Sequence, residues 1–128
     1  GDLGVEKRQR QTAIETDPAK KTEASMILGH MYRILEESEN AVAAYKKVLE
    51  TSPDDADALA YAGLMLVDLG WLKDNDKALS QEGANFLQKF VSVAPDTHKL
   101  KIGAVEYLAI LKEQKIIPVK ATPAKRKN

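Results

Sequence analysis

The strongest constraint on the fold is a pattern of apolar and small residues that recurs after 34 residues. The spacing occurs in two sets, first Ser25, Leu28, Gly29 and Tyr32 and then Leu59, Ala62, Gly63 and Leu66. Within each set the residues stand three or four positions apart, or side by side, as they do on one face of a helix. A recurring period of this length predicts a stack of similar helical units.

Apolar periodicity predicts helices over 19–37, from about Ser38 to Pro53, over 56–70, 76–94 and 97–114, with a weaker one over 5–18. Glycine at position 29 is explained if a neighbouring helix crosses close to it. Asp54 or Asp55 is expected to cap the third helix, and Gly70 to end it in the left-handed conformation. The second set is followed by eight additional residues, expected between Gly70 and about Ser80 as a loop and extra helical turns.

Residues 22–95 resemble tetratricopeptide repeats. The first unit has the family's residues at Leu28, Gly29, Tyr32, Ala41, Tyr45 and Pro53, and the second has Gly63, Gly70 and Pro95. Ser25 and Glu36 depart from the family, which often has Trp and Gly there. The second unit also departs, with Ala62 and Leu66 at the Leu and Tyr positions and with the insertion.

The resemblance implies an all-α fold, a right-handed solenoid (α-α superhelix) of about six antiparallel helices. Residues 1–18 would be a half-repeat or a capping helix, and residues 19–116 the helical domain. Within it, repeat 1 covers 22–55, repeat 2 with its insertion covers 56–97, and a closing helix covers 97–115. Residues 117–128 read as a basic extended tail, with two prolines and little helical pattern.

The resemblance also implies a concave groove, lined by the first helix of each pair, that binds an extended or helical peptide. Carried over by position, the groove residues are Met26, His30, Arg33, Asp57, Ala60, Leu64, Val67, Asp68, Lys101, Val105 and Leu108. An alternative is that Leu64 and Val67 are covered by the opening or closing helix. Trp71 could anchor a partner, since exposed aromatic residues often dominate interfaces, or could instead cover the end of its helix.

The expected function is a non-enzymatic protein-interaction module or assembly scaffold. The alternative is a segment of a longer repeat array, or a self-associating protomer that uses the apolar face as an oligomer interface. Periplasmic tetratricopeptide subunits of cytochrome c maturation also carry an insertion in a middle repeat, which is a weaker resemblance without a diagnostic residue.

Composition and motifs favour no other class. Lys plus Arg and Asp plus Glu both total 19, so no net charge attracts nucleic acid. The longest apolar run, 58–67, is too short to span a membrane. His30 and His98 lack the spacing of zinc ligands, and no nucleophile motif or phosphate loop is present, so we expect no catalysis, metal or cofactor. The compartment stays open between the cytoplasm and an exported location reached after loss of a targeting segment.

Overall fold

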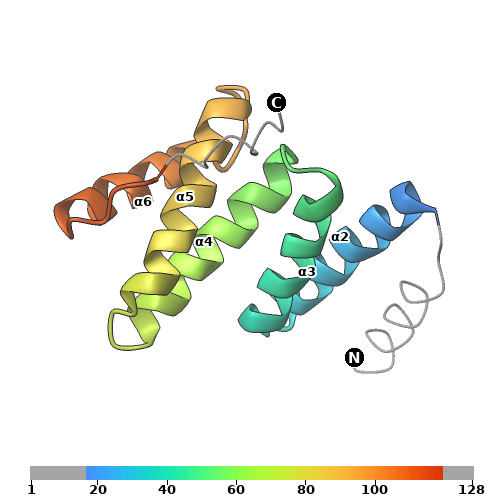
Figure 1. Cartoon of the computed structure of the whole chain (residues 1–128), viewed down its shortest axis with the longest axis horizontal. Coiled ribbons are helices and arrows are strands. Elements are labelled where there is room, and N and C mark those ends of the chain that lie inside the picture. Colours follow the sequence, from blue (N-terminus) through green and yellow to red (C-terminus); the bar gives the residue numbers. More distant parts are fainter. Residues whose placement is uncertain (1–16, 120–128) are drawn as a thin grey trace, which may run out of the picture.

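A computed structural model describes residues 17–119, and this part of the chain is helical without strands. Its helices are α2 (Pro18–Ile34), α3 (Ser38–Thr51), α4 (Ala56–Leu72), α5 (Lys77–Val93) and α6 (Lys101–Glu113) (Figure 1). The all-α class is therefore confirmed. The first four described helices lie within about three residues of their predicted bounds, whereas the last begins at Lys101 and not at the predicted residue 97. The predicted helix over 5–18 lies almost entirely outside the described residues.

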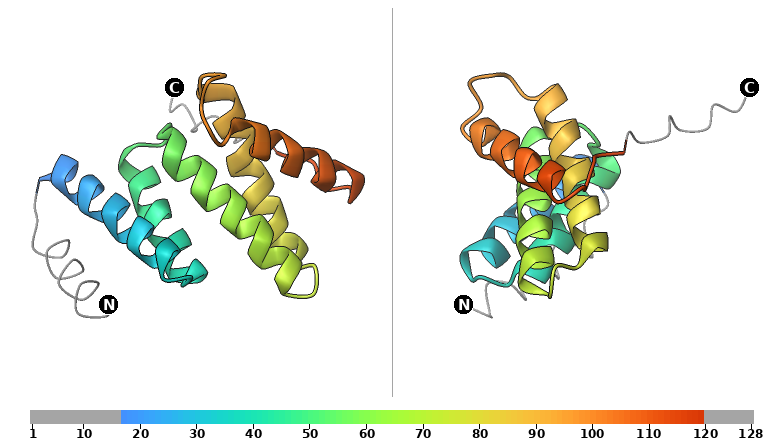
Figure 2. Two further views of the ribbon diagram at one scale, coloured as in Figure 1. Left: turned by 180° about the vertical axis from the view of Figure 1, so that it is seen from behind. Right: turned by 90° about the vertical axis from the view of Figure 1, so that its left-hand side faces the viewer.

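The helices form two layers. We call α2, α4 and α6, which run roughly parallel to one another, layer A, and α3 and α5 layer B (Figure 2). The most extensive contacts join α2 to α3 and α4 to α5, so each pair is an antiparallel hairpin with one helix in each layer. The central helix α4 contacts α3, α5 and α6, and thereby joins the pairs.

Two apolar clusters make up the core. One, centred on Tyr45 and Val48, lies between α2, α3 and α4. The other, centred on Leu87 and Phe90, lies between α4, α5, α6 and the residues that follow α6. Both clusters meet at α4, which explains why this helix reads as apolar on most of its circumference.

Aspartates fix the starts of three helices. Asp17 accepts a hydrogen bond from Ala19 N, and Asp55 accepts one from Ala58 N, both at 3.0 Å. Asp76 accepts from Ala78 N and Leu79 N at 3.0 and 3.2 Å. Each bond satisfies a backbone donor that has no partner inside its own helix. The predicted capping by Asp55 is confirmed.

Glycines stand where paired helices cross most closely. A Cβ atom placed on Gly29 would lie 2.7 Å from Tyr45 Cε1, and one on Gly63 would lie 2.8 Å from Leu87 Cδ2. Across from Gly63, a Cβ on Gly83 would lie 2.8 Å from the Gly63 carbonyl oxygen. The expectation of a close helix crossing at Gly29 is confirmed, and the α4–α5 crossing at Gly63 and Gly83 is of the same kind.

The predicted end of the third helix at Gly70 is wrong. Gly70 is inside α4, which continues to Leu72, and the left-handed residues are Asp74 and Asn75, with φ of 52° and 54°. Gly70 is instead needed for close packing, because its Cβ would lie 3.0 Å from the Asp76 carbonyl oxygen. The chain turns back at that point, where Asp76 N donates to Gly70 O at 2.8 Å.

The end of α2 is a Schellman turn. Glu37 N donates to Tyr32 O at 2.9 Å, and Glu36 N donates to Arg33 O at 3.1 Å. Glu36 takes the left-handed conformation of this turn, with φ of 60°. This is the position where tetratricopeptide repeats often have Gly. A glutamate there is strained, because its Cβ crowds the backbone in the left-handed conformation.

We therefore expect Glu36→Gly to raise the free energy of unfolding by up to about 1 kcal/mol, because relief of the left-handed strain exceeds the added freedom of the unfolded chain. The matched change Glu106→Gly, at an exposed position inside α6, should lower it by about 1 kcal/mol. Urea denaturation measures both. A loss of stability in Glu36→Gly would show that the glutamate contributes more than its strain costs.

Candidate functional site

The residues predicted to line a groove all belong to layer A, but they are not equally accessible. Ala60 and Val67 are fully buried in the cluster between α4, α5 and α6. The prediction that they line an open groove is therefore wrong, because both pack inside the helix stack. Val67 Cγ2 is the atom nearest to a Cβ placed on Gly83. The alternative for Val67 was covering by the opening or closing helix, but the close contact at Gly83 comes from α5, which is neither.

The other predicted residues are partly or fully exposed. Leu64 and Leu108 are half-buried against the cluster of α4, α5 and α6, and Met26 against the cluster of α2, α3 and α4. Val105 is 50% exposed on α6, and Asp57 and Asp68 are exposed on α4. The remaining residues, His30, Arg33 and Lys101, are half-buried, and each makes specific polar contacts.

His30 and Arg33 converge on one buried phenol. Arg33 Nε donates to the hydroxyl of Tyr45 at 3.1 Å, and His30 Nδ1 lies 2.7 Å from the same oxygen. The Arg33 guanidinium carbon also lies 4.3 Å from the centre of the Tyr61 ring. The Tyr45 and Tyr61 rings stack with centroids 5.4 Å apart. We call these four residues the Arg33 cluster.

The pKa values of the Arg33 cluster indicate its protonation. The Tyr45 hydroxyl accepts from Arg33, and its bond with His30 Nδ1 can run in either direction, because the hydroxyl oxygen has a second lone pair as well as its proton. Burial, together with the nearby Arg33 charge, lowers the pKa of His30 below its ordinary value. Burial likewise raises the pKa of Tyr45. A neutral His30 and a neutral Tyr45 therefore hold a permanently charged Arg33.

This arrangement predicts a pH-dependent stability. The unfolded chain has an ordinary histidine pKa of about 6.5, so below that pH it binds more protons at residue 30 than the folded chain. The contribution of His30 to the free energy of unfolding should be fully present above about pH 6.5. It should decrease as the pH falls towards the lowered pKa that His30 has in the folded chain. Between about pH 7 and 5, the melting temperature of His30→Gln should fall less than that of the wild type. His98→Gln keeps His30, so its melting temperature should retain the decrease that is due to His30. Equal slopes for wild type and His30→Gln would refute the assignment.

Asp57 and Lys101 hold the start of α6 rather than facing an open groove. His98 Nε2 lies 2.7 Å from Asp57 Oδ1, while His98 Nδ1 accepts from Leu100 N at 3.1 Å. Lys101 Nζ donates to Ala94 O at 2.8 Å and to Asp96 at 2.9 Å. These bonds fix the turn between α5 and α6, a structural role that neither position's spacing indicated.

Trp71 and Asp68 join α4 to α6. The Trp71 indole NH donates to Gln114 Oε1 at 3.1 Å, and its ring centroid lies 5.2 Å from that of Tyr107. The Tyr107 hydroxyl donates to Asp68 at 2.8 Å, and burial together with this carboxylate raises the pKa of Tyr107 to about 12. Trp71 is thus half-buried and engaged within the chain.

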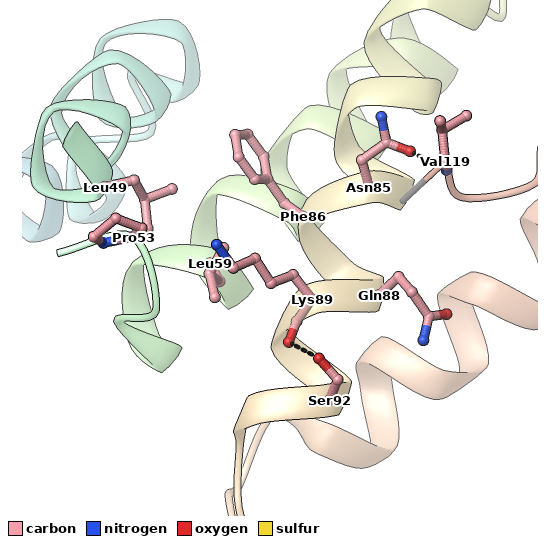
Figure 3. Close-up of a pocket in the computed structure, with 9 residues that line it drawn as sticks. All are labelled: Leu49, Pro53, Leu59, Asn85, Phe86, Gln88, Lys89, Ser92 and Val119. Carbon is pink, nitrogen blue, oxygen red and sulfur yellow. Dashed lines mark hydrogen bonds between the residues drawn. The ribbon is translucent and has the colours of Figure 1, made fainter. Parts of the chain in front are cut away.

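A hollow among the described residues lies in layer B, on the other side of the molecule from the predicted groove. It has a volume of about 440 Å³ and opens between the end of α3 and the outer face of α5 (Figure 3). Its apolar lining is Leu49, Pro53, Leu59, Phe86 and Val119. The polar lining, Asn85, Gln88, Lys89 and Ser92, comes entirely from α5. No sequence pattern indicated this hollow, because its walls come from three helices and the segment after α6.

The segment after α6, residues 116–119, runs beside α5. Gln81 Nε2 donates to Ile117 O at 2.7 Å, and Val119 N donates to Asn85 Oδ1 at 2.7 Å. Ile116 is buried in the same cluster as Leu111. This segment brings Val119 to the edge of the layer B hollow (Figure 3). We call residues 116–119 the C-terminal strap.

Within residues 17–119 no group of three or more His, Asp or Glu side chains is placed to hold a metal ion, and no helix there is long and apolar enough to cross a membrane. Comparisons with protein-family models, curated proteins and solved structures gave no match to the sequence. Among the described residues, the Arg33 cluster in layer A and the hollow in layer B are two candidate binding sites.

Proposed function

We propose that the chain is a non-enzymatic binding module of the tetratricopeptide type, and that the Arg33 cluster holds an acidic segment of a partner protein. The observation that carries the proposal is the state of Arg33. Arg33 is half-buried, yet no carboxylate among residues 17–119 forms an ion pair with it, whereas the lysines of that range that lack an ion pair, such as Lys47 and Lys99, are exposed.

The cluster also fixes the orientation of the guanidinium group. The bond from Arg33 Nε to Tyr45 and the contact with the Tyr61 ring leave the terminal nitrogens as the donors for a ligand. A guanidinium that is already oriented loses less side-chain entropy when it binds a carboxylate. Met26 stands four residues before His30 and Leu64 three residues after Tyr61, so each lies on the same helix face as a member of the cluster, and both are half-buried. This apolar surface favours a segment that combines an acidic with an apolar residue.

A displayed library of random linear peptides, selected against the whole chain, tests the proposal. We expect recovered peptides to carry Asp or Glu beside an apolar residue, and Arg33→Gln to weaken their binding by about tenfold, since a hydrogen bond to a charged group contributes roughly 1.5–3 kcal/mol. Lys47→Gln is the control, because it removes the same charge from an exposed position of α3 in layer B. Peptides without acidic residues, or binding that Arg33→Gln leaves unchanged, would contradict the proposal.

Self-association is the second candidate. Ile102 and Val105 are 76% and 50% exposed on α6, which is the one layer A helix of the described residues that no layer B helix follows. Two copies could bury these side chains against each other. Concentration-dependent sedimentation that Ile102→Asp abolishes would favour this function over the peptide-binding one.

A further inference from the structure

His30 and Arg33 lie close together because they share a hydrogen-bond partner. The Tyr45 hydroxyl oxygen lies 2.7 Å from His30 Nδ1 and 3.1 Å from Arg33 Nε. The other nitrogens of these two side chains, His30 Nε2 and the terminal nitrogens of Arg33, have no hydrogen-bond partner among residues 17–119, and none of them is buried. A carboxylate bound by the Arg33 terminal nitrogens would therefore lie near an accessible imidazole nitrogen.

The bond to Tyr45 permits His30 to become protonated while its ring stays in place. A hydroxyl oxygen has two lone pairs as well as its proton, so the Tyr45 oxygen can accept a bond from His30 Nδ1 beside the one that Arg33 Nε donates. The second proton of the imidazolium then lies on the accessible Nε2. The Tyr45 ring is fully buried and stacks on Tyr61, which fixes the position of the shared oxygen.

In the free chain, the surroundings of His30 disfavour its charged form. The largest cause that lowers its pKa is burial, followed by the Arg33 charge, while Asp57 and Asp55 partly oppose both. The groups around the ring that carry or can carry a charge are Arg33 on α2, Tyr45 on α3, Asp55, Asp57 and Tyr61 at the start of α4 or within it, and Lys99 before α6. A carboxylate bound to Arg33 adds a negative charge beside the ring and so offsets the effect of the Arg33 charge.

We propose that the Arg33 cluster takes up a proton on His30 when it binds an acidic segment, so that the segment binds more tightly at mildly acidic than at neutral pH. The inference rests on the proposed function, because it concerns the same ligand. Binding and protonation are linked, and each strengthens the other by the same factor. Arg33 stays charged throughout this pH range, and an aspartate of the ligand stays ionised above about pH 5.

Nuclear magnetic resonance of the imidazole ring protons tests the inference on the whole chain. The probe is a histidine-free peptide from the displayed library that carries Asp and whose binding Arg33→Gln weakens. Because His30 and His98 are the only histidines in the chain, the spectrum of His98→Gln assigns the His30 signals. We expect the midpoint of the His30 titration to move to higher pH when the peptide is bound at saturation. A midpoint that stays where it is, or moves to lower pH, would refute the inference.

The affinity for the same peptide gives a second measurement. Fluorescence anisotropy at constant ionic strength should show the wild type binding about fivefold more tightly at about pH 5.5 than at about pH 7.5, since raising a pKa by one unit changes the affinity at most tenfold. His30→Gln should lose this dependence on pH, whatever its affinity at neutral pH, because glutamine does not titrate. His98→Gln is the matched control and should keep the wild-type dependence. Circular dichroism at both pH values shows whether each variant is folded.

The outcomes separate this inference from the proposed function. If Arg33→Gln weakens binding but the affinity of the wild type is the same at both pH values, or if His30→Gln keeps the dependence on pH, the inference is wrong and the proposed function stands. A dependence that His98→Gln removes and His30→Gln keeps would assign the proton to His98. If no acidic peptide binds through Arg33, both the inference and the proposed function are wrong.

Discussion

Gly83→Ala is expected to lower the free energy of unfolding by about 2–3 kcal/mol, a typical cost of overpacking a tight core. The added methyl group would meet Val67 Cγ2 at 2.6 Å and the Gly63 carbonyl oxygen at 2.8 Å. Since the second neighbour is backbone, α4 and α5 must separate to admit it. For a domain of this size, each kcal/mol lowers the melting temperature by roughly 4–8 °C.

Gly103→Ala is the matched control, because the same change is made inside α6 at a position where a Cβ meets nothing within 4 Å. There alanine's higher helix propensity should add about 1 kcal/mol of stability. If thermal denaturation shows a loss of stability for Gly83→Ala and a gain for Gly103→Ala, the close α4–α5 crossing is established. A Gly83→Ala variant as stable as wild type would mean that the helices are further apart.

The second large effect is expected for Tyr45→Ala, at about 4 kcal/mol, within the range for removing a fully buried aromatic side chain. Tyr45 has no exposed surface and packs on Gly29, stacks on Tyr61 and bonds to His30 and Arg33. Tyr45→Phe separates the two contributions, because it keeps the ring and removes only the hydroxyl. We expect it to cost about 1 kcal/mol.

Tyr45→Phe also tests how Arg33 is oriented. Without the hydroxyl, Arg33 Nε loses its bond and the guanidinium has only the Tyr61 ring to hold it. Affinity for acidic peptides should then fall several-fold in a chain whose fold is intact, measured by fluorescence anisotropy beside circular dichroism. Unchanged affinity would show that Tyr61 alone positions Arg33.

Much of the fold could be predicted because local sequence determines it. The three- and four-residue spacing of Leu28, Gly29 and Tyr32 defines a helix face, and Asp55 next to a helical pattern is a capping signal. The end of α4 was predicted wrongly because a glycine near the end of a helix has two uses. Gly70 serves close packing, and Asp74 and Asn75 take the left-handed turn.

The candidate sites were harder to predict. The groove residues were assigned by their position in the first helix of each pair, which placed His30 and Arg33 on layer A. Position in a repeat could not distinguish exposed side chains from buried ones. Ala60 and Val67 are buried because neighbouring helices cover them, which depends on how the pairs stack. The layer B hollow depends on the path of the C-terminal strap, which follows a left-handed Lys115 with φ 64°. Nothing in a lysine signals such a turn.

The order of helix contacts has a mechanical consequence. Apart from the contact between α4 and α6, the main contacts join helices that are consecutive in the chain. Force applied to the two ends of such a chain acts on one interface after another, since each unit contacts only its neighbours. A single molecule pulled between its ends should therefore extend in steps, and α2 with α3 can detach while α4, α5 and α6 keep their own core.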